Sequence, residues 1–147
     1  MDREVLSCFQ EITQQEYLDT DSQEYLENQG YTLISSLGVD RLVFETQNNT
    51  VIKVARNKDK IDVNYDEDAF WSQNKHGNLF CPIVSTGPHY TWIEMEYCTK
   101  KPSDFDKYKE KIDKSMWTIP DLHPDNIGLR NKTNELVCFD YPDTIKE

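Results

Sequence analysis

Two neighbouring stretches decide the fold: residues 119–130 read IPDLHPDNIGLR, and residues 138–142 read CFDYP. Short apolar runs on either side of a polar connection are typical of a β-hairpin. The sequence therefore predicts strands over Ile127–Arg130 and Leu136–Phe139, joined by the connection Asn131–Glu135.

The register of this hairpin would bring polar side chains together. If the strands close across the connection, Ile127 lies opposite Phe139, and the next pair outward is Asn126 and Asp140. An amide oxygen and a carboxylate oxygen then meet at the open end of the hairpin. Hard cations such as Mg²⁺ take oxygen ligands of this kind, together with phosphate oxygens. Asp121 lies earlier on the same loop, where it is placed to orient a hydroxyl group or accept its proton.

A lysine stands in the middle of an otherwise apolar predicted strand, Val51–Ala55. An ammonium group in such a place is costly unless it is paired. The candidate partner of Lys53 is Glu67, on a helix predicted over Asn64–Asn74. A pair of this kind would hold the ammonium group against phosphates.

β-Branched and aromatic residues gather in short runs along the middle of the chain, separated by turn residues. They predict three strands, the helix Asn64–Asn74 and two more strands, which make a five-stranded antiparallel sheet with one helix, of the α+β class. The predicted strands are Tyr31–Leu37, Arg41–Thr46, Val51–Ala55, Pro82–Ser85 and Trp92–Tyr97. A further amphipathic helix is predicted to begin at an N-cap, Ser103, and to carry an apolar stripe of Phe105, Tyr108, Ile112 and Met116.

The first 30 residues differ from the rest in charge. They hold eight acidic residues against one arginine, a net charge of −7, whereas the other 117 residues carry a net charge of −4. Val5, Leu6, Phe9 and Ile12 recur at helical spacing, and Ser22 is a candidate cap for a second short helix. This segment is either a helical prelude packed on the body, with its acids in solvent, or an acidic interaction arm that could mimic nucleic-acid charge.

The composition limits the functions open to the chain. Its 147 residues, formal charge of −11 and 37% hydrophobic content allow one compact domain with a modest core. Strong acidity argues against nonspecific binding to nucleic acid or anionic membranes, because both need a basic face. No apolar run approaches the roughly 18 residues of a spanning helix. The acidic start is unlike a signal peptide, so we expect a soluble protein of the cytoplasm, or of the host cytoplasm or virion if it is viral.

Cysteine usage agrees with that compartment. The four cysteines are widely spaced and form no C-x-x-C pair, which indicates buried thiols in a reducing environment. They are Cys8, Cys81, Cys98 and Cys138.

Taken in order, a strand lysine, a helix glutamate, the pattern D-x-x-x-x-N over residues 121–126 and an aspartate after a hairpin resemble the protein-kinase-like superfamily. The motif DLHPDN at residues 121–126 is similar to the corresponding loop of the small-molecule branch of this superfamily, which includes aminoglycoside and choline phosphotransferases. The chain also resembles short kinase-like proteins of phages, archaeal viruses and haloarchaea. The resemblance covers residues 31–142.

The resemblance implies ATP and Mg²⁺ as cofactors and assigns a role to each candidate residue. Lys53 would contact phosphates, Glu67 would pair with it, and Asp121 would be the catalytic base. Asn126 and Asp140 would hold the metal ion. The nucleotide would also be contacted by Gly38 and Arg41 in the first loop and by Glu96 and Cys98 in the hinge.

The chain departs from the kinase pattern in three ways. The first loop has one glycine, Gly38, where kinases have three, and Ile119-Pro120 stands where His-Arg or His-Gly precedes the catalytic aspartate of kinases. The chain also ends seven residues after Asp140, with no activation segment. We therefore expect an acidic helical extension over 1–30, a kinase-like N-lobe over 31–98 and a truncated C-lobe with the catalytic loop and metal-binding hairpin over 99–147.

Two functions follow from these features. One is a minimal Mg-ATP phosphotransferase, whose acceptor is a protein bound in trans or a small molecule covered by a second copy of the chain. The other is a pseudokinase-type interaction protein, which could be viral, that contacts a host or assembly partner without catalysis. The acidic first 30 residues favour the second function, and so does the absence of the helices that form the substrate platform of a kinase. The five retained polar residues favour the first function.

Overall fold

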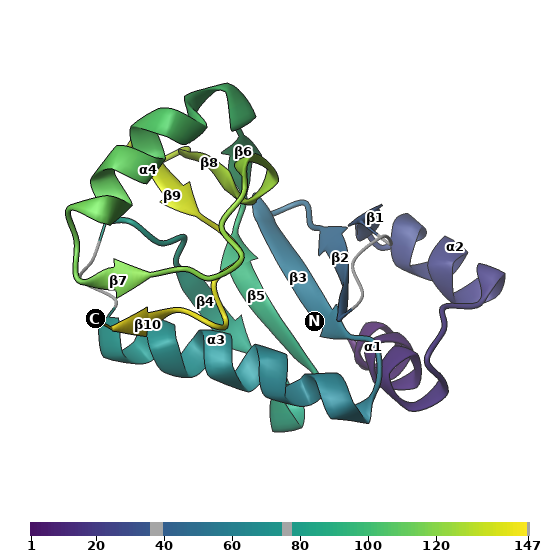
Figure 1. Ribbon diagram of the computed structural model, residues 1–147. Coiled ribbons are helices and arrows are strands. Elements are labelled where there is room, and N and C mark those ends of the chain that lie inside the picture. The colour runs from purple at the N-terminus through teal and green to yellow at the C-terminus, as the bar shows by residue number, and fades with distance from the viewer. Residues whose placement is uncertain (36–39, 75–77, 147) are drawn as a thin grey trace. The chain divides into compact units, whose positions relative to one another are not determined.

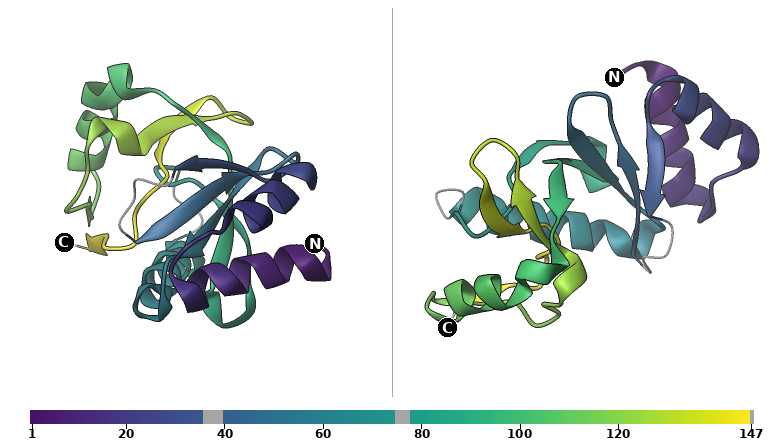
Figure 2. Two further views of the ribbon diagram at one scale, coloured as in Figure 1. Left: turned by 90° about the vertical axis from the view of Figure 1, so that its right-hand side faces the viewer. Right: turned by 90° about the horizontal axis from the view of Figure 1, so that it is seen from above.

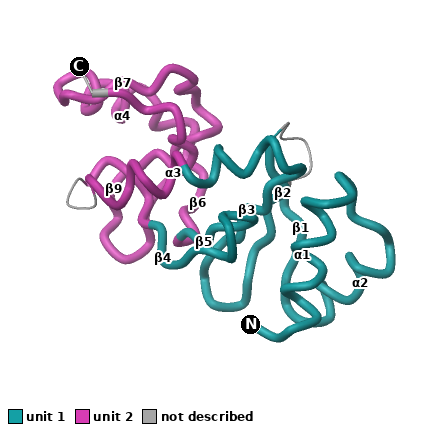
Figure 3. The backbone as a smooth tube through the Cα atoms, turned by 90° about the horizontal axis from the view of Figure 1, so that it is seen from below, with its two compact units in different colours: residues 1–65, 83–95 teal, residues 66–82, 96–147 magenta. Residues whose placement is uncertain are grey.

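The computed structural model describes residues 1–35, 40–74 and 78–146. The chain divides into two compact units, coloured separately in Figure 3: unit 1 comprises residues 1–65 and 83–95, and unit 2 comprises residues 66–82 and 96–147. Compact units need not be domains, so the boundaries expected at residues 30 and 98 stay predictions. Among the described residues, no helix has the length and apolar character needed to cross a membrane.

The predicted five-stranded antiparallel sheet is confirmed, and with it the α+β class (Figure 1). The strand order is β1-β2-β3-β5-β4. β2 pairs with both β1 and β3, and β4 pairs with β5. The strands are β1 (Thr32–Ser35), β2 (Arg41–Glu45), β3 (Thr50–Ala55), β4 (Ile83–Thr86) and β5 (Trp92–Glu96). The end of the first predicted strand, at residues 36 and 37, lies outside the described residues.

Two helices at the start of the chain complete the core of unit 1: α1 (Arg3–Gln15) and α2 (Thr20–Asn28). Figure 2 shows them beside the strands β1–β3. The apolar side of α1 is buried, and the Phe9 ring lies 5.5 Å from the Phe44 ring and 6.4 Å from the Trp92 ring, between centroids. The predicted helical periodicity of this segment is therefore confirmed, and its apolar face belongs to the core.

The cap predicted for α2 is wrong. The helix begins at Thr20, and the Asp19 carboxylate accepts the backbone N–H of Ser22 at 2.7 Å. Ser22 therefore lies in the first turn as the donor and not as the cap. An aspartate accepts this hydrogen bond as well as a serine does.

Unit 2 contains a second small sheet, of order β6-β8-β9, and most of the long helix α3. Helix α3 starts three residues before its predicted position, after a 3₁₀ turn at Lys58–Lys60. The shorter pair β7 and β10 forms a third sheet. The elements are α3 (Ile61–Asn74), β6 (Cys98–Lys100), α4 (Phe105–Asp113), β7 (Trp117–Thr118), β8 (Ile127–Arg130), β9 (Glu135–Cys138) and β10 (Ile145–Lys146).

Helix α4 differs from its prediction at both ends. Ser103 lies inside a 3₁₀ turn, Pro102–Asp104, and the residue at the N-cap is Asp104. Tyr108 and Ile112 are buried as predicted, but Met116 lies beyond the end of the helix and is 51% exposed. Because the 3₁₀ turn begins with Pro102 and includes Ser103, the N-cap position of the helix falls one residue later, at Asp104.

The register predicted for the hairpin is wrong by one residue. Ile127 lies opposite Cys138, and Phe139 donates its N–H to the carbonyl oxygen of Asn126 at 3.0 Å. The connection has four residues, because Asn134 adopts a positive φ of 57° and donates its N–H to Arg130. The predicted cross-strand pair of Asn126 and Asp140 is therefore replaced by Asn126 and Phe139.

Candidate functional site

The best-defined polar contact among the predicted site residues involves Glu67. Its side chain is completely buried, and its carboxylate accepts the backbone N–H of Tyr141 at 2.6 Å. A buried carboxylate requires partners of this kind. Because Tyr141 directly follows Asp140, helix α3 fixes the backbone next to the predicted metal ligand.

Tyr141 anchors the same place from a second direction. Its hydroxyl group donates to the carbonyl oxygen of Cys81 at 2.5 Å, and its ring centroid lies 5.1 Å from that of Phe80. On the other side of Asp140, the Cys138 thiol donates to the Asp140 carbonyl oxygen at 3.2 Å. The Asp140 backbone is therefore held on both sides. Sequence analysis missed Tyr141, although an aromatic residue straight after the motif aspartate was a usable signal.

The predicted catalytic loop is organised by its own asparagine. The Asn126 side-chain Nδ2 donates to the backbone carbonyl oxygen of Asp121 at 3.4 Å, and its backbone N–H donates to His123 at 3.0 Å. The amide oxygen of Asn126 is left as the end that can ligate a cation. The structure thus brings Asn126 and Asp121 together, and the Asp121 carboxylate is exposed to solvent.

The two residues predicted to hold a metal ion carry one amide oxygen, on Asn126, and one carboxylate, on Asp140, although the two residues are not the cross-strand pair that was predicted. This donor set fits Mg²⁺, which is usually held by one or two protein carboxylates together with water and phosphate oxygens. The part of the chain that the structure describes holds no group of three or more His, Cys, Asp and Glu side chains suited to a metal ion.

Lys53 lies in unit 1, on β3, and is 4% exposed. Its backbone carbonyl oxygen accepts the Nδ2 of Asn64 at 3.4 Å, and Asn64 also donates to the carbonyl oxygen of Tyr90 at 2.9 Å. The lysine is therefore buried in the strand where the sequence placed it. Its pairing with Glu67 stays a prediction.

The two residues predicted for the nucleotide loop have different outcomes. Arg41 is buried, and its guanidinium group donates to the Asn64 side-chain oxygen at 3.2 Å. Asn64, which sequence analysis missed, thus connects Arg41 to the backbone of Lys53. Gly38 lies outside the described residues, and the phosphate contacts of both residues stay predictions.

The predicted hinge is held by an ion pair inside unit 2. The Glu96 carboxylate receives Nε and Nη2 of Arg130 at 2.9 and 3.1 Å, which raises the pKa of Arg130. The backbone N–H of Glu96 donates to Pro82, and Cys98 pairs with Arg130 in the small sheet. The Glu96 side chain is thus paired with Arg130. The backbone carbonyl oxygen of Glu96 accepts the Cys81 thiol and has a second lone pair for another donor. Adenine contacts of Glu96 and Cys98 stay predictions.

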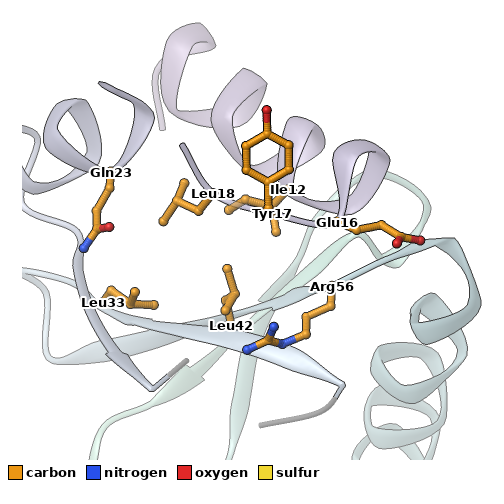
Figure 4. A pocket seen from close by; sticks show the side chains of 8 residues that line it. All are labelled: Ile12, Glu16, Tyr17, Leu18, Gln23, Leu33, Leu42 and Arg56. Atoms are coloured by element: carbon orange, nitrogen blue, oxygen red, sulfur yellow. The ribbon is translucent and has the colours of Figure 1, made fainter. Parts of the chain in front are cut away.

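Unit 1 also holds a cavity of about 330 Å³ that was not expected from the sequence (Figure 4). Figure 4 shows Leu18, Leu33 and Leu42 around its middle, with Gln23 and Arg56 on opposite sides of them. Its described lining contains none of the predicted site residues.

No protein-family model and no curated protein matches this chain. Solved structures do match. The structure of WbdD with the kinase inhibitor LY294002 is 14% identical, covers 78% of this chain and 33% of its own, and has a TM-score of 0.51. The ternary complex of streptomycin, ATP and APH(2'')-IIa is 19% identical, covers 68% of this chain and 36% of its own, and has a TM-score of 0.43.

The chain thus spans about a third of the length of the solved structures it matches. The likeness to WbdD concerns the fold, and the elements of this chain described above include the five-stranded sheet, the helix α3 and the hairpin. From this likeness and these elements, the chain has a protein-kinase-like fold.

Proposed function

We propose that this chain is a minimal Mg-ATP-dependent phosphotransferase. The observation that carries the proposal is the hydrogen bond that the buried Glu67 carboxylate accepts from the backbone N–H of Tyr141. A buried carboxyl group needs hydrogen-bond partners, and this one positions the residue next to Asp140. The WbdD structure, which shares the fold, was solved with a kinase inhibitor.

The roles proposed for the residues follow their chemistry. The Asn126 amide oxygen and the Asp140 carboxylate would hold Mg²⁺, and the Lys53 ammonium group would neutralise phosphate charge. Bound Mg-ATP would supply the transferable phosphoryl group. Asp121 would orient the acceptor hydroxyl and take up its proton. Glu67 would act through the backbone of Tyr141 as a positioning residue.

The contacts to the rest of the nucleotide are proposed for four residues. Gly38 and Arg41 would approach the phosphates, and Glu96 and Cys98 would approach the adenine ring. The acceptor would be a protein bound in trans or a small molecule enclosed by a second copy.

A second candidate is a pseudokinase-type interaction protein. It is favoured by the acidic side chains of α1 and α2, most of which are exposed while the apolar faces of the helices are buried. This candidate predicts no phosphoryl transfer, whether or not the chain binds nucleotide.

Thermal melting with MgCl₂ and ATP tests the first proposal. A ligand at 100 times its Kd stabilises the folded state by about 2.7 kcal/mol, so the melting temperature should rise. The rise should disappear in Lys53→Ala and Asp140→Asn. The matched controls, Lys107→Ala and Asp125→Asn, change exposed side chains and should keep it. No rise for the wild type at millimolar Mg-ATP would contradict nucleotide binding.

Phosphoryl transfer is tested separately from binding. Asp121→Asn should retain the Mg-ATP melting shift and abolish release of phosphate from ATP or its transfer to the protein itself. Equal turnover in Asp121→Asn and the wild type would contradict its role as the base.

A further inference from the structure

Two buried thiols of unit 2 lie unusually close together. The Sγ atoms of Cys81 and Cys98 are 2.7 Å apart, although the residues are separated by 17 positions. A disulfide bond is about 2.05 Å long. A thiol is a weak hydrogen-bond donor and a weak acceptor, so hydrogen bonding alone gives little reason for this approach.

The backbones of both cysteines are fixed around this contact. Cys81 donates its N–H to the carbonyl oxygen of Cys138 at 2.9 Å, and its own carbonyl oxygen accepts the Tyr141 hydroxyl group. Cys98 begins β6 and pairs with Arg130 on β8. The Cys81 thiol also donates to the carbonyl oxygen of Glu96 at 3.1 Å. The two sulfur atoms are thus held together by the fold of unit 2.

We propose that Cys81 and Cys98 form a reversible disulfide, with hydrogen peroxide as the oxidant. Cys98 is 8% exposed and Cys81 is completely buried, so peroxide reaches Cys98 first. The Cys98 sulfur attacks one peroxide oxygen, the O–O bond breaks, and a sulfenic acid and one water molecule form. The Cys81 sulfur then attacks the Cys98 sulfur, the S–O bond breaks, and the thiol proton leaves with the hydroxyl group as a second water molecule.

The other two cysteines, Cys8 and Cys138, serve as internal controls for oxidation by peroxide. Cys8, in unit 1, is also 8% exposed, but desolvation by burial raises its pKa, and the nearby Glu11, Glu4 and Asp19 carboxylates raise it further. Little reactive thiolate is therefore available at Cys8. Cys138 is completely buried, and its thiol donates to the carbonyl oxygen of Asp140.

Peptide mass spectrometry of the full-length protein tests the proposal. Trypsin cuts after Lys75 and Lys100, so Cys81 and Cys98 fall in one peptide, residues 76–100, while Cys8 and Cys138 fall in two others. After mild peroxide treatment and alkylation in denaturant, this peptide should lose the mass of two hydrogen atoms and carry no alkyl group. Cys8 and Cys138 should be alkylated, and dithiothreitol should restore two alkylation sites in residues 76–100.

Variants and stability provide a second measurement. The oxidised wild type should melt at a higher temperature than the reduced protein, because the cross-link restricts the unfolded chain. Cys98→Ser should abolish the shift, and Cys8→Ser should keep it. Alkylation of both cysteines in residues 76–100 after peroxide, or a cross-link between any other pair, would overturn the proposal. The wild-type peptide result stands even if Cys98→Ser fails to fold.

Discussion

The carboxylate of Glu67 accepts the Tyr141 N–H in the interior of unit 2, at 2.6 Å. Glu67→Ala leaves this buried donor without its acceptor, which costs about 1–3 kcal/mol of unfolding free energy. Glu67→Gln keeps an acceptor oxygen and should cost less. Urea denaturation measures both. The control, Glu110→Ala, removes an exposed partner of Lys114 and should change the unfolding free energy by less than about 1 kcal/mol. Equal losses for Glu67→Ala and Glu110→Ala would contradict the assigned contact.

Tyr108 should make the stability of unit 2 depend on alkaline pH. Burial raises the pKa of its phenol, whose hydroxyl group donates to the carbonyl oxygen of Leu79 at 2.7 Å. The unfolded chain has a tyrosine pKa of about 10. The folded pKa is the higher one, so the contribution of Tyr108 is complete below about pH 10 and is lost as the pH rises above that value.

Tyr108→Phe tests this dependence. The variant should lose about 1 kcal/mol at neutral pH with the hydrogen bond. Above about pH 10 its unfolding free energy should fall less steeply than that of the wild type, by up to about 1.4 kcal/mol per pH unit. Urea denaturation at a series of pH values measures the slopes, with Tyr17→Phe as an exposed control. Parallel slopes for wild type and Tyr108→Phe would show that Tyr108 does not titrate differently in the two states.

The sequence identified two of the buried charged residues but not the residues that form hydrogen bonds around them. Lys53 stood out because a charge in an apolar run needs an explanation, and Glu67 stood out as its candidate partner on the following helix; both are buried. Asn64 gave no such signal, because asparagine is common in many settings, and the only signal from Tyr141 was its place directly after the motif aspartate. Their hydrogen bonds to Arg41 and Glu67 depend on contacts between residues far apart in the sequence, which no local pattern encodes.

At the scale of the element, helix α2 is started by Asp19. Asp19→Ala should cost about 1 kcal/mol, because the N–H of Ser22 loses its acceptor and the helix loses its cap. Ser22→Ala keeps that N–H and should change the unfolding free energy by less than about 0.5 kcal/mol. Thermal or urea unfolding of the two variants separates them. A larger loss for Ser22→Ala than for Asp19→Ala would restore Ser22 as the cap.

Periodicity predicted the elements well and their ends poorly. Alternating and helical patterns are set by side-chain burial, so the five strands and the helices α1, α3 and α4 were found near their true positions. The hairpin register depended on whether the connection had four or five residues. The positive φ of Asn134 decided this point, and a shift of one residue moves every side chain to the other face of a strand.

At the scale of the whole molecule, the first 30 residues have a buried apolar side, which belongs to the core of unit 1, and an exposed acidic side. The apolar faces of α1 and α2 belong to the core with Phe44, Ile52 and Trp92, and the Thr13 hydroxyl group donates to the carbonyl oxygen of Ala55 at 2.8 Å. Most of the acidic side chains remain exposed. The sequence offered a packed prelude and an acidic arm as alternatives, and the buried apolar faces of both helices agree with the packed prelude.

Removing residues 1–30 should therefore destroy the core of unit 1. The shortened chain would expose Phe44, Ile52 and Trp92 and lose the Phe9 ring from between them. Losing one buried phenylalanine already costs about 3–5 kcal/mol, which is comparable with the whole stability of many domains. We expect a chain that aggregates or lacks a cooperative unfolding transition by circular dichroism.

The matched control keeps the helices and removes charge. A full-length protein with Glu4→Gln, Glu24→Gln and Glu27→Gln changes three exposed side chains and leaves the buried face intact. It should unfold cooperatively near the wild-type temperature, because exposed charges contribute little to stability. A shortened chain that folds as cooperatively as this control would mean that the strands β1–β5 form their core without α1, and that the acidic segment is an appended arm.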